Sequence, residues 1–238
     1  MQKILVTGGA GFIGSHTVDA LLQAGCAVTV LDNLSSGRRD NLPGHHALQF
    51  VNADIRDAAA VAAAVQGMDA VLHLAAQVSV QTSIEQPVES SDINVRGFLN
   101  VLDASRNAGV KRFVYASSAA VYGIPAQLPL NEQAPTAPLS PYGLEKLIND
   151  QYAALYRELY ATSALGMRYF NVYGPRQDPR SPYAGVISKF NDGARSGGGL
   201  KIFGDGLQTR DFIYVGDVAR ANVAALAGEL QGVCNIGT

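Results

Sequence analysis

The segment "TGGAGFIGS", residues 7–15, constrains the fold more than any other part of this chain. It follows the apolar run "KILV" and precedes a helix-like segment that begins at about Phe12. Gly8, Gly11 and Gly14 suit a tight turn, a close approach of the backbone to a diphosphate, and close packing of the helix on the sheet. The helix N-terminus that follows favours negative charge. The segment therefore predicts a strand, a phosphate-binding turn and a helix.

A second apolar run, residues 26–32, ends in Asp32. A carboxylate in this position accepts hydrogen bonds from the ribose hydroxyls of a dinucleotide and repels the extra phosphate of NADP, so NAD is favoured. Arg38 and Arg39 could hold that phosphate, but they lie several residues past the strand end and are interpreted as solvated loop charges. A glycine-rich turn with a purely structural role is the alternative, and the context of strand, helix and Asp32 argues against it.

Short apolar runs alternate with helix-like segments along the chain. The predicted strands are residues 3–8, 26–32, 47–54, 68–76, 111–118, 163–171 and 232–237. Two predicted helices begin at residues 12 and 140, and the others cover about 58–65, 88–108, 186–194 and 217–227. Residues 200–206 and 210–215 have a strand-like composition. This alternation predicts an α/β fold, namely a Rossmann-type doubly wound parallel sheet with helices on both faces.

Composition and charge exclude some classes of function. Apolar residues make up 47% of the 238 residues, which is typical of a globular protein, and the formal net charge is -2 without charged blocks. No nucleic acid or membrane partner is expected, since no basic patch and no apolar run of about 20 residues occurs. Cys26 and Cys234 lie in apolar strand-like segments far apart in the sequence, which predicts reduced thiols in a cytoplasmic protein. Neither the histidines nor the cysteines have the spacing of metal ligands, so no metal is expected.

The segment "SPYGLEK", residues 140–146, predicts the start of a helix, with Ser140 as the cap and Pro141 in the first turn. Tyr142 and Lys146 are four residues apart, so both side chains lie on one face of this helix. An amphipathic surface pair is the alternative to chemistry. Tyr152, Tyr156 and Tyr160 recur at helical spacing and are interpreted as packing or interface residues.

Several motifs in this order resemble one family. The phosphate loop, "HLAA" at residues 73–76, "SSAAVYG" at 117–123 and "SPYGLEK" resemble the extended short-chain dehydrogenase/reductase family. The segments "RYFNVYGPRQDP" and "RDFIYVGDVARA" are similar to its nucleotide-sugar branch, and most similar to UDP-sugar 4-epimerases of the UDP-glucose or UDP-N-acetylglucosamine type. The resemblance runs along essentially the whole chain.

This resemblance implies roles for particular residues. It implies a catalytic triad of Ser118, Tyr142 and Lys146, where the choice of Ser118 over Ser117 rests on motif alignment alone. The implied NAD contacts, besides Tyr142 and Lys146, are Gly8, Gly11, Phe12, Ile13, Gly14, Asp32, Asn33, Asp54, Ile55, Leu74, Ala75, Ala76 and Asn94. The implied substrate contacts, besides Ser118 and Tyr142, are Asn171, Arg176, Arg210, and Val186 and Lys189 in the loop "SPYAGVISKF". Arg176 and Arg210 could instead be structural, Arg210 by pairing with Asp211.

The chemistry of such a triad follows from its residue types. A tyrosine has an ordinary pKa of about 10, so a nearby lysine ammonium and the positive nicotinamide are expected to favour its phenolate. Tyr142 would then remove the proton of a sugar C4 hydroxyl while the C4 hydride passes to NAD, and Ser118 would hold the developing carbonyl. Return of the hydride to the other face of a transient 4-keto intermediate inverts C4.

Other reactions of the family use the same triad. Nucleotide-sugar dehydratases need an acidic pair after the strand-end hydroxyl, where this chain has Ala119 and Ala120, so dehydration is disfavoured. A UDP-glucuronate decarboxylase or a keto-sugar reductase is harder to exclude. A non-catalytic NAD-binding protein is a third class, but no triad residue is missing.

The division of the chain follows the change in texture after Tyr173, where Pro, Gly and Arg become frequent. Residues 1–170 are predicted as the NAD-binding domain, and residues 171–238 as substrate-binding elements mixed with a late strand and helix. The chain ends at "NIGT", whereas relatives continue, so a small and truncated substrate-binding part is expected. Relatives commonly dimerise through the Ser140 helix and the helix before the fifth strand, which predicts a homodimer.

Overall fold

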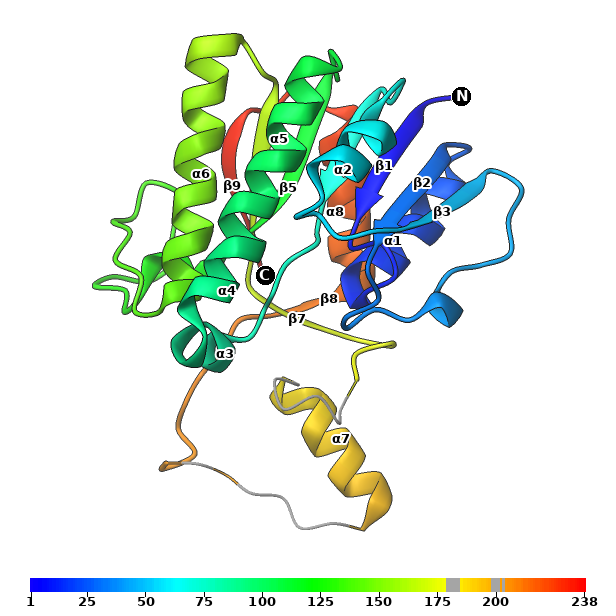
Figure 1. Cartoon of the computed structure of the whole chain (residues 1–238). Coiled ribbons are helices and arrows are strands. Elements are labelled where there is room, and N and C mark those ends of the chain that lie inside the picture. Colours follow the sequence, from blue (N-terminus) through cyan, green and yellow to red (C-terminus); the bar gives the residue numbers. More distant parts are fainter. Residues whose placement is uncertain (179–184, 198–201, 203) are drawn as a thin grey trace.

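A computed structural model describes residues 1–178, 185–197, 202 and 204–238. Its centre is one parallel sheet with the strand order β3-β2-β1-β4-β5-β6-β9 (Figure 1). These strands are β1 (Lys3–Thr7), β2 (Ala27–Asp32), β3 (Leu48–Asn52), β4 (Ala70–His73), β5 (Arg112–Ser118), β6 (Ala164–Tyr169) and β9 (Gly232–Ile236). The order reverses between β1 and β4, which is where doubly wound sheets bind their ligands.

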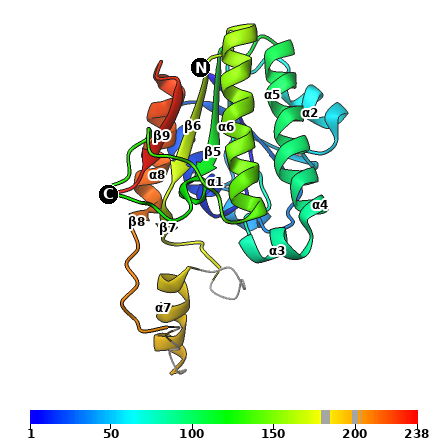
Figure 2. The same ribbon diagram turned by 90° about the vertical axis from the view of Figure 1, so that its left-hand side faces the viewer.

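Helices cover both faces of this sheet, as Figure 2 shows from the side. One face carries α1 (Phe12–Gln23) and α8 (Val215–Ala227), and the other carries α2 (Ala58–Val65), α5 (Gly97–Asn107) and α6 (Pro141–Tyr160). The apolar residues separate accordingly into two cores. In β1, Ile4 and Val6 belong to the first core and Leu5 to the second, because successive strand residues point to opposite faces. The predicted Rossmann-type fold is confirmed.

The predicted helix at 88–108 is divided in the structure. Helix α4 (Pro87–Ser91) passes into a π-helical turn, Asp92–Arg96, and then into α5. Helix α3 (Val80–Glu85) and two 3-10 helices, Arg39–Asn41 and Ala119–Tyr122, were not predicted. π-helical turns often occur at functional sites.

The chain after β6 forms a second small sheet and then returns to the main one. Strands β7 (Asn171–Tyr173) and β8 (Phe212–Tyr214) pair in parallel, and α7 (Val186–Ser196) lies apart from both helical layers in Figures 1 and 2. The strand-like segment 200–206 contains no strand among its described residues. No helix in the described parts of the chain is long and apolar enough to span a membrane.

Candidate active site

The glycine turn after β1 forms a cradle of backbone. Gly8 has a φ of +70°, and a Cβ at this residue would lie 2.6 Å from Ala75 N. A Cβ at Gly14 would lie 2.2 Å from Gly8 O, so neither position has room for a side chain. Helix α1 begins at Phe12, as predicted, and its first turn has neither an acidic residue nor a side-chain cap. Because the first N–H groups of a helix carry partial positive charge, this turn fits a diphosphate.

Asp32 ends β2, as predicted, and its side chain is buried. The carboxylate accepts hydrogen bonds from Ala10 N at 3.0 Å and from Leu34 N at 2.8 Å. Asp32 therefore joins the glycine turn to the segment that follows β2, where Leu34 adopts a φ of +58°. The guanidinium of Arg39 lies over the Phe50 ring, 5.1 Å from its centroid.

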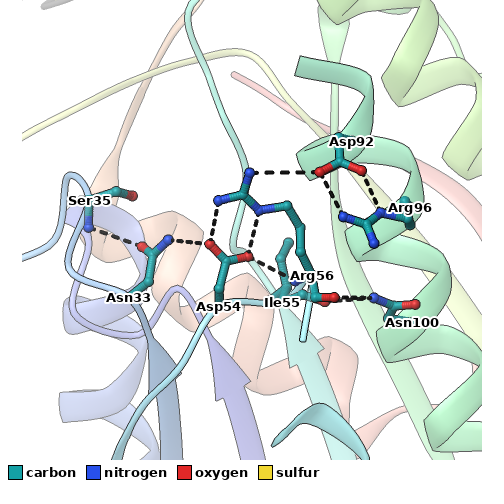
Figure 3. Close-up of polar contacts among 8 residues, drawn as sticks. All are labelled: Asn33, Ser35, Asp54, Ile55, Arg56, Asp92, Arg96 and Asn100. Atoms are coloured by element: carbon teal, nitrogen blue, oxygen red, sulfur yellow. Dashed lines mark hydrogen bonds and ion pairs between the residues drawn. The ribbon is translucent and has the colours of Figure 1, made fainter. Parts of the chain in front are cut away.

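Figure 3 shows a polar network at the ends of β2 and β3. Asp54 Oδ1 accepts hydrogen bonds from Arg56 N at 2.8 Å and Nε at 3.0 Å. Its Oδ2 accepts from Arg56 Nη2 at 2.8 Å and from Asn33 Nδ2 at 2.9 Å. The hydrogen bonds from Arg56 hold the pKa of Asp54 well below its usual range. A carboxylate offers about four acceptor positions, so a bond from adenine to Asp54 requires exchange with Arg56 or Asn33.

Ile55 lies between this network and α5. Its side chain is 4% exposed and packs against Gly97, where a Cβ would lie 2.6 Å from Ile55 Cδ1. Its carbonyl accepts a hydrogen bond of 3.0 Å from Asn100 Nδ2. The side chain belongs to the second core, so only the backbone of Ile55 is positioned to contact a nucleotide.

The segment after β4, with Leu74, Ala75 and Ala76, runs beside the glycine turn. Leu74 N donates to Thr7 O at 3.0 Å, and Ala75 N donates to Thr7 Oγ1 at 3.3 Å. Asn94 lies 2% exposed in the π-helical turn and binds both backbone groups of Gln77, with its Oδ1 accepting from Gln77 N and its Nδ2 donating to Gln77 O, each at 2.8 Å. The predicted cofactor residues of β1, β4 and the π-helical turn therefore lie along one edge of the sheet.

The Ser140 helix begins as the sequence predicted. Ser140 Oγ accepts a hydrogen bond of 3.1 Å from Gly143 N, and Pro141 occupies the first turn of α6. The backbone N–H of Tyr142 is held by Ser83 Oγ at 3.1 Å. Lys146 is 3% exposed, its Nζ donates to Ala116 O in β5 at 3.0 Å, and it lies 5.8 Å from the centroid of the Tyr142 ring. The pair predicted from spacing is thus fixed against the end of β5.

The two hydroxyls at the end of β5 differ in position. Ser117 is buried, and its Oγ has no hydrogen-bond partner among the described residues. Ser118 is half-buried, its Oγ accepts a hydrogen bond of 3.1 Å from Ala120 N, and its hydroxyl interacts with Tyr142. Adjacent strand residues point to opposite faces, and Ser118 is the one on the side of the phenol. Ser118 therefore stays the predicted partner of Tyr142.

Burial dominates the electrostatics of the pair. It raises the pKa of Tyr142 above the ordinary value, a hydrogen bond with Ser118 lowers it, and the Glu145 charge raises it further. Burial also lowers the pKa of Lys146 to about 8, although Asp150 and Glu145 act to raise it. The expectation that the lysine would favour the phenolate is therefore not met by the protein alone, because desolvation outweighs the distant ammonium.

The described hydrogen bonds and ion pairs of the predicted substrate residues are made with groups other than the triad. Asn171 Nδ2 donates to Asp211 O at 2.8 Å, between β7 and β8. Arg176 pairs with Asp19 of α1 at 2.8 Å, and Arg210 Nη1 donates to Thr209 O at 2.8 Å. The Asp211 carboxylate accepts from the backbone N–H and the hydroxyl of Thr238. Val186 and Lys189 lie on α7, away from the sheet, and residues 181–184 of their predicted loop lie outside the described residues.

Two buried acids of α6 were missed by the sequence analysis. Asp150 pairs with Arg168 Nε at 3.1 Å and accepts a hydrogen bond of 3.0 Å from Tyr115 Oη. Glu145 is 2% exposed and lies between the two predicted catalytic residues of α6. Helical spacing from Lys146 could have indicated Asp150, since residues four apart share a face.

Known proteins similar to this chain agree with the fold and the motifs. A family model described as the NAD dependent epimerase/dehydratase family matches residues 4–237. UDP-glucose 4-epimerase of Mycolicibacterium smegmatis is 44% identical over 94% of this chain and 73% of its own sequence. A UDP-N-acetyl-alpha-D-glucosaminuronate decarboxylase of Bacillus cytotoxicus is also similar, at 36% identity over all of this chain and 75% of its own.

Two solved structures are similar over nearly the whole chain. UDP-N-acetylglucosamine 4-epimerase of Methanobrevibacter ruminantium, in complex with UDP-N-acetylmuramic acid, has a TM-score of 0.96 and 41% identity and is matched over 99% of this chain and 76% of that one. UDP-glucose 4-epimerase of Thermus thermophilus, in complex with NAD, has a TM-score of 0.92 and 42% identity. The match covers 100% of this chain and 78% of that one. The predicted resemblance is confirmed, and this protein belongs to the NAD dependent epimerase/dehydratase family.

Proposed function

We propose that this protein is an NAD-dependent epimerase that inverts C4 of a UDP-hexose. The observation that carries the proposal is the position of Tyr142, which lies beside Ser118 at the end of β5 and one helical turn from the buried Lys146. A phenol, a hydroxyl and an ammonium at the carboxyl edge of a doubly wound sheet can remove and return the proton of a carbinol, while NAD bound at this edge would take and return the hydride. UDP-glucose, UDP-galactose and their N-acetyl forms are the candidate substrates.

The glycine cradle and Asp32 would hold the cofactor, NAD, which the family description names. Bound NAD supplies the acceptor and the donor of one hydride. Asp32 would bind the adenosine ribose, and its charge disfavours a phosphate at the same place. A side chain at Gly8 or Gly14 would collide with neighbouring backbone, so the turn presents bare main chain. This surface fits a ligand that approaches the main chain closely.

The triad residues would carry the proton and hold the oxygen. Tyr142 Oη takes the proton of the C4 hydroxyl as the C4 hydrogen leaves with its electron pair, which gives a 4-keto sugar. The Ser118 hydroxyl donates a hydrogen bond to the carbonyl oxygen that forms. When the hydride returns to the other face, Tyr142 gives the proton back to the C4 oxygen, so atoms and charges balance. Lys146, anchored to Ala116 O, keeps a positive charge near the phenol.

The same triad could serve a second reaction. A nucleotide-sugar dehydratase would need an acid and a base after Ser118, and Ala119 and Ala120 of the 3-10 helix supply neither. A UDP-glucuronate decarboxylase also needs the oxidation at C4; loss of carbon dioxide then leaves an enolate whose C5 takes a proton from water, and a decarboxylase occurs among the similar proteins. Decarboxylation is therefore the second candidate.

We place the UDP of the substrate on the segments after β6, so that residues 1–170 would bind NAD and residues 171–238 would contribute the substrate contacts. Arg210 is the proposed ligand of the diphosphate, because a guanidinium binds phosphate through paired hydrogen bonds. Arg176 would have to leave Asp19 to take the same role. Asn171, Val186 and Lys189 are kept as proposed nucleotide contacts.

A homodimer through α6 is part of the proposal. One side of this helix carries the exposed residues Leu144, Leu155 and Leu159, which share a face at spacings of 11 and 4 residues, opposite the buried Lys146. Sedimentation equilibrium should give twice the mass of the chain, and Leu155→Glu should shift the protein toward the monomer. A monomer at all concentrations would contradict the dimer.

The proposed activity is tested with purified protein, NAD and four substrates: UDP-glucose, UDP-galactose and their N-acetyl forms. The proposal predicts interconversion of at least one pair, followed by proton NMR of the sugar C1 position, and no carbon dioxide from UDP-glucuronate. Tyr142→Phe should retain NAD and lose turnover. Release of carbon dioxide without any epimer would favour the decarboxylase, and no reaction with any sugar nucleotide would contradict both.

A further inference from the structure

The proposed proton transfer gives no role to Glu145, a buried acid of the catalytic helix. Glu145 lies between Tyr142 and Lys146 in α6, and its side chain is 2% exposed. Burial of a carboxylate is unfavourable unless hydrogen bonds replace its water. The hydrogen-bond partners of Glu145 therefore indicate its role in the structure.

Three donors of the α4 region bind the Glu145 carboxylate. Oε2 accepts hydrogen bonds from Asn94 Nδ2 at 2.7 Å and from Ser90 Oγ at 2.9 Å. Oε1 accepts from Ser91 Oγ at 3.2 Å. The donors come from the end of α4 and from the π-helical turn, 51 to 55 residues before Glu145 in the sequence. The acid thus joins two helices at the point where one of them departs from α-helical geometry.

Asn94 extends this connection to the segment beside the glycine turn. Its Oδ1 accepts from Gln77 N and its Nδ2 donates to Gln77 O, in addition to the bond with Glu145. Glu145 accepts from the same Nδ2 group that donates to Gln77 O, so it stabilises the orientation of the Asn94 amide that both Gln77 groups require. The Gln77 side chain also donates to Ser90 Oγ at 3.2 Å. Five residues, with Ser91 bound to Glu145, therefore form one connected network between α6 and the segment after β4.

We propose that Glu145 is a positioning residue, which fixes Asn94 and through it the segment 74–77, and so sets the width of the NAD site between that segment and Tyr142. This inference rests on the proposed function, because it needs NAD at this edge. Its geometry is specific to a carboxylate of this length. Oε2 accepts hydrogen bonds from both Ser90 and Asn94, and Oε1 accepts one from Ser91.

The charge of Glu145 has a separate effect, which gives a second readout. Its negative charge raises the pKa of Tyr142 and that of Lys146. The other ionisable groups that act on this part of α6 are Asp150 on the same helix and His73 from β4, whose pKa burial lowers to about 3, so it is neutral. Arg168 of β6 and Tyr115 of β5 also face this helix, where both contact Asp150. The groups that contact Tyr142 and Glu145 directly are uncharged, namely Ser83, Ser90, Ser91, Asn94 and Ser118. Removal of the charge should therefore lower the pKa of Tyr142.

Two substitutions separate length from charge, and a third is the matched control. Glu145→Asp keeps the charge and shortens the side chain, whereas Glu145→Gln keeps the length and replaces one oxygen by an N–H₂ group that faces donors. Ser91→Ala removes a hydrogen bond to the same carboxylate but leaves the connection to Asn94. Binding of NAD and of UDP is measured by calorimetry on the full chain, with circular dichroism to verify folding, and kcat is measured against pH.

The proposal predicts that Glu145→Asp and Glu145→Gln each weaken NAD binding by about tenfold or more, as expected for a lost hydrogen bond to a charged group. Binding of UDP should stay within about twofold in both, a ratio too small to indicate a lost contact. Only Glu145→Gln should move the acid limb of kcat to lower pH, and Ser91→Ala should change neither quantity.

Other outcomes would overturn the inference. Equal NAD affinity in the wild type and in the folded Glu145 variants would do so, as would a loss in Ser91→Ala as large as that in Glu145→Asp. If one Glu145 variant does not fold, the other decides. These results leave the proposed function intact, because the wild type then still binds NAD and turns over. A wild type that binds no NAD would overturn both proposals.

Discussion

The substitution Arg168→Met should destabilise the protein strongly and in a pH-dependent way. Arg168 in β6 and Asp150 in α6 form an ion pair of 3.1 Å, and each side chain is 6% exposed. Arg168 Nη1 also donates to Tyr122 Oη at 2.8 Å. Methionine keeps much of the volume of arginine but leaves the Asp150 carboxylate with no cation at that distance. The pair lies one helical turn beyond Lys146, so it also fixes the catalytic helix on the sheet.

The magnitude follows from the burial of both partners. Removal of one partner of a buried ion pair costs about 3–5 kcal/mol, since the remaining charge stays desolvated. For a chain of this size, each kcal/mol lowers Tm by about 2–4 °C, so Arg168→Met should lower it by about 6–20 °C. Arg96→Met is the matched control, because Arg96 pairs with Asp92 and its side chain is 57% exposed. An exposed pair contributes about 0–1 kcal/mol.

The pH dependence has a definite sign. Burial raises the pKa of Asp150, and the charge and hydrogen bonds of Arg168 lower it. Loss of Arg168 therefore raises the folded-state pKa of Asp150 further above the unfolded value, and the folded variant binds a proton more readily than the unfolded chain. The free energy of unfolding that Arg168→Met loses should be largest above this raised pKa and should decrease as the pH falls through it.

Urea unfolding at neutral and at mildly acidic pH measures the free energy of unfolding and its pH dependence in the two variants and in the wild type. The expected result is a large loss in Arg168→Met at neutral pH, a smaller loss in acid, and a small loss without this trend in Arg96→Met. If the two variants lose the same free energy, or if the loss in Arg168→Met does not change with pH, the account of the buried pair is refuted.

Two further predictions concern the cofactor cradle and the base. Gly14→Ala should weaken NAD binding by about tenfold or more, since its Cβ would lie 2.2 Å from Gly8 O. Gly44→Ala is the control, because a Cβ there would have no neighbour within 4 Å and Gly44 lies outside the cradle; calorimetry with NAD compares them, and equal losses would contradict the cradle. Tyr142→Phe should lower kcat by about 10²–10⁴ and retain NAD. In the wild type kcat should fall as the pH drops below the pKa of Tyr142, because Tyr142 must be deprotonated to act. The residual activity of Tyr142→Phe should not show this fall, which a stopped assay across pH would measure.

Local patterns in the sequence predicted the parts of the site that depend on neighbouring residues. The glycine turn, the start of α1 at Phe12, Asp32 at the end of β2 and the Ser140 cap all follow from residues within one turn or strand of each other. The spacing of Tyr142 and Lys146 also placed them on one helical face. These features are set by backbone geometry and capping, which a short segment of sequence largely determines.

Contacts between distant segments could not be predicted in this way. Glu145 is tied to Asn94 across 51 residues, and Arg176 is tied to Asp19 across 157 residues. No local pattern indicates the π-helical turn that carries Asn94 into the site. The raised pKa of Tyr142 likewise depends on how deeply the assembled fold buries the phenol. These long distances in sequence explain why the sequence predicted residues of the site but did not predict the groups that they contact.

The central claim is that the C4 hydrogen of the sugar leaves and returns as one hydride while Tyr142 exchanges only the hydroxyl proton. Turnover of a UDP-hexose that carries deuterium at C4, in ordinary water, tests it most directly. Direct hydride transfer predicts that the epimer retains the deuterium at C4, and that the product formed from unlabelled substrate in heavy water carries none there. Loss of the label to solvent, or incorporation of solvent deuterium at C4, would contradict it.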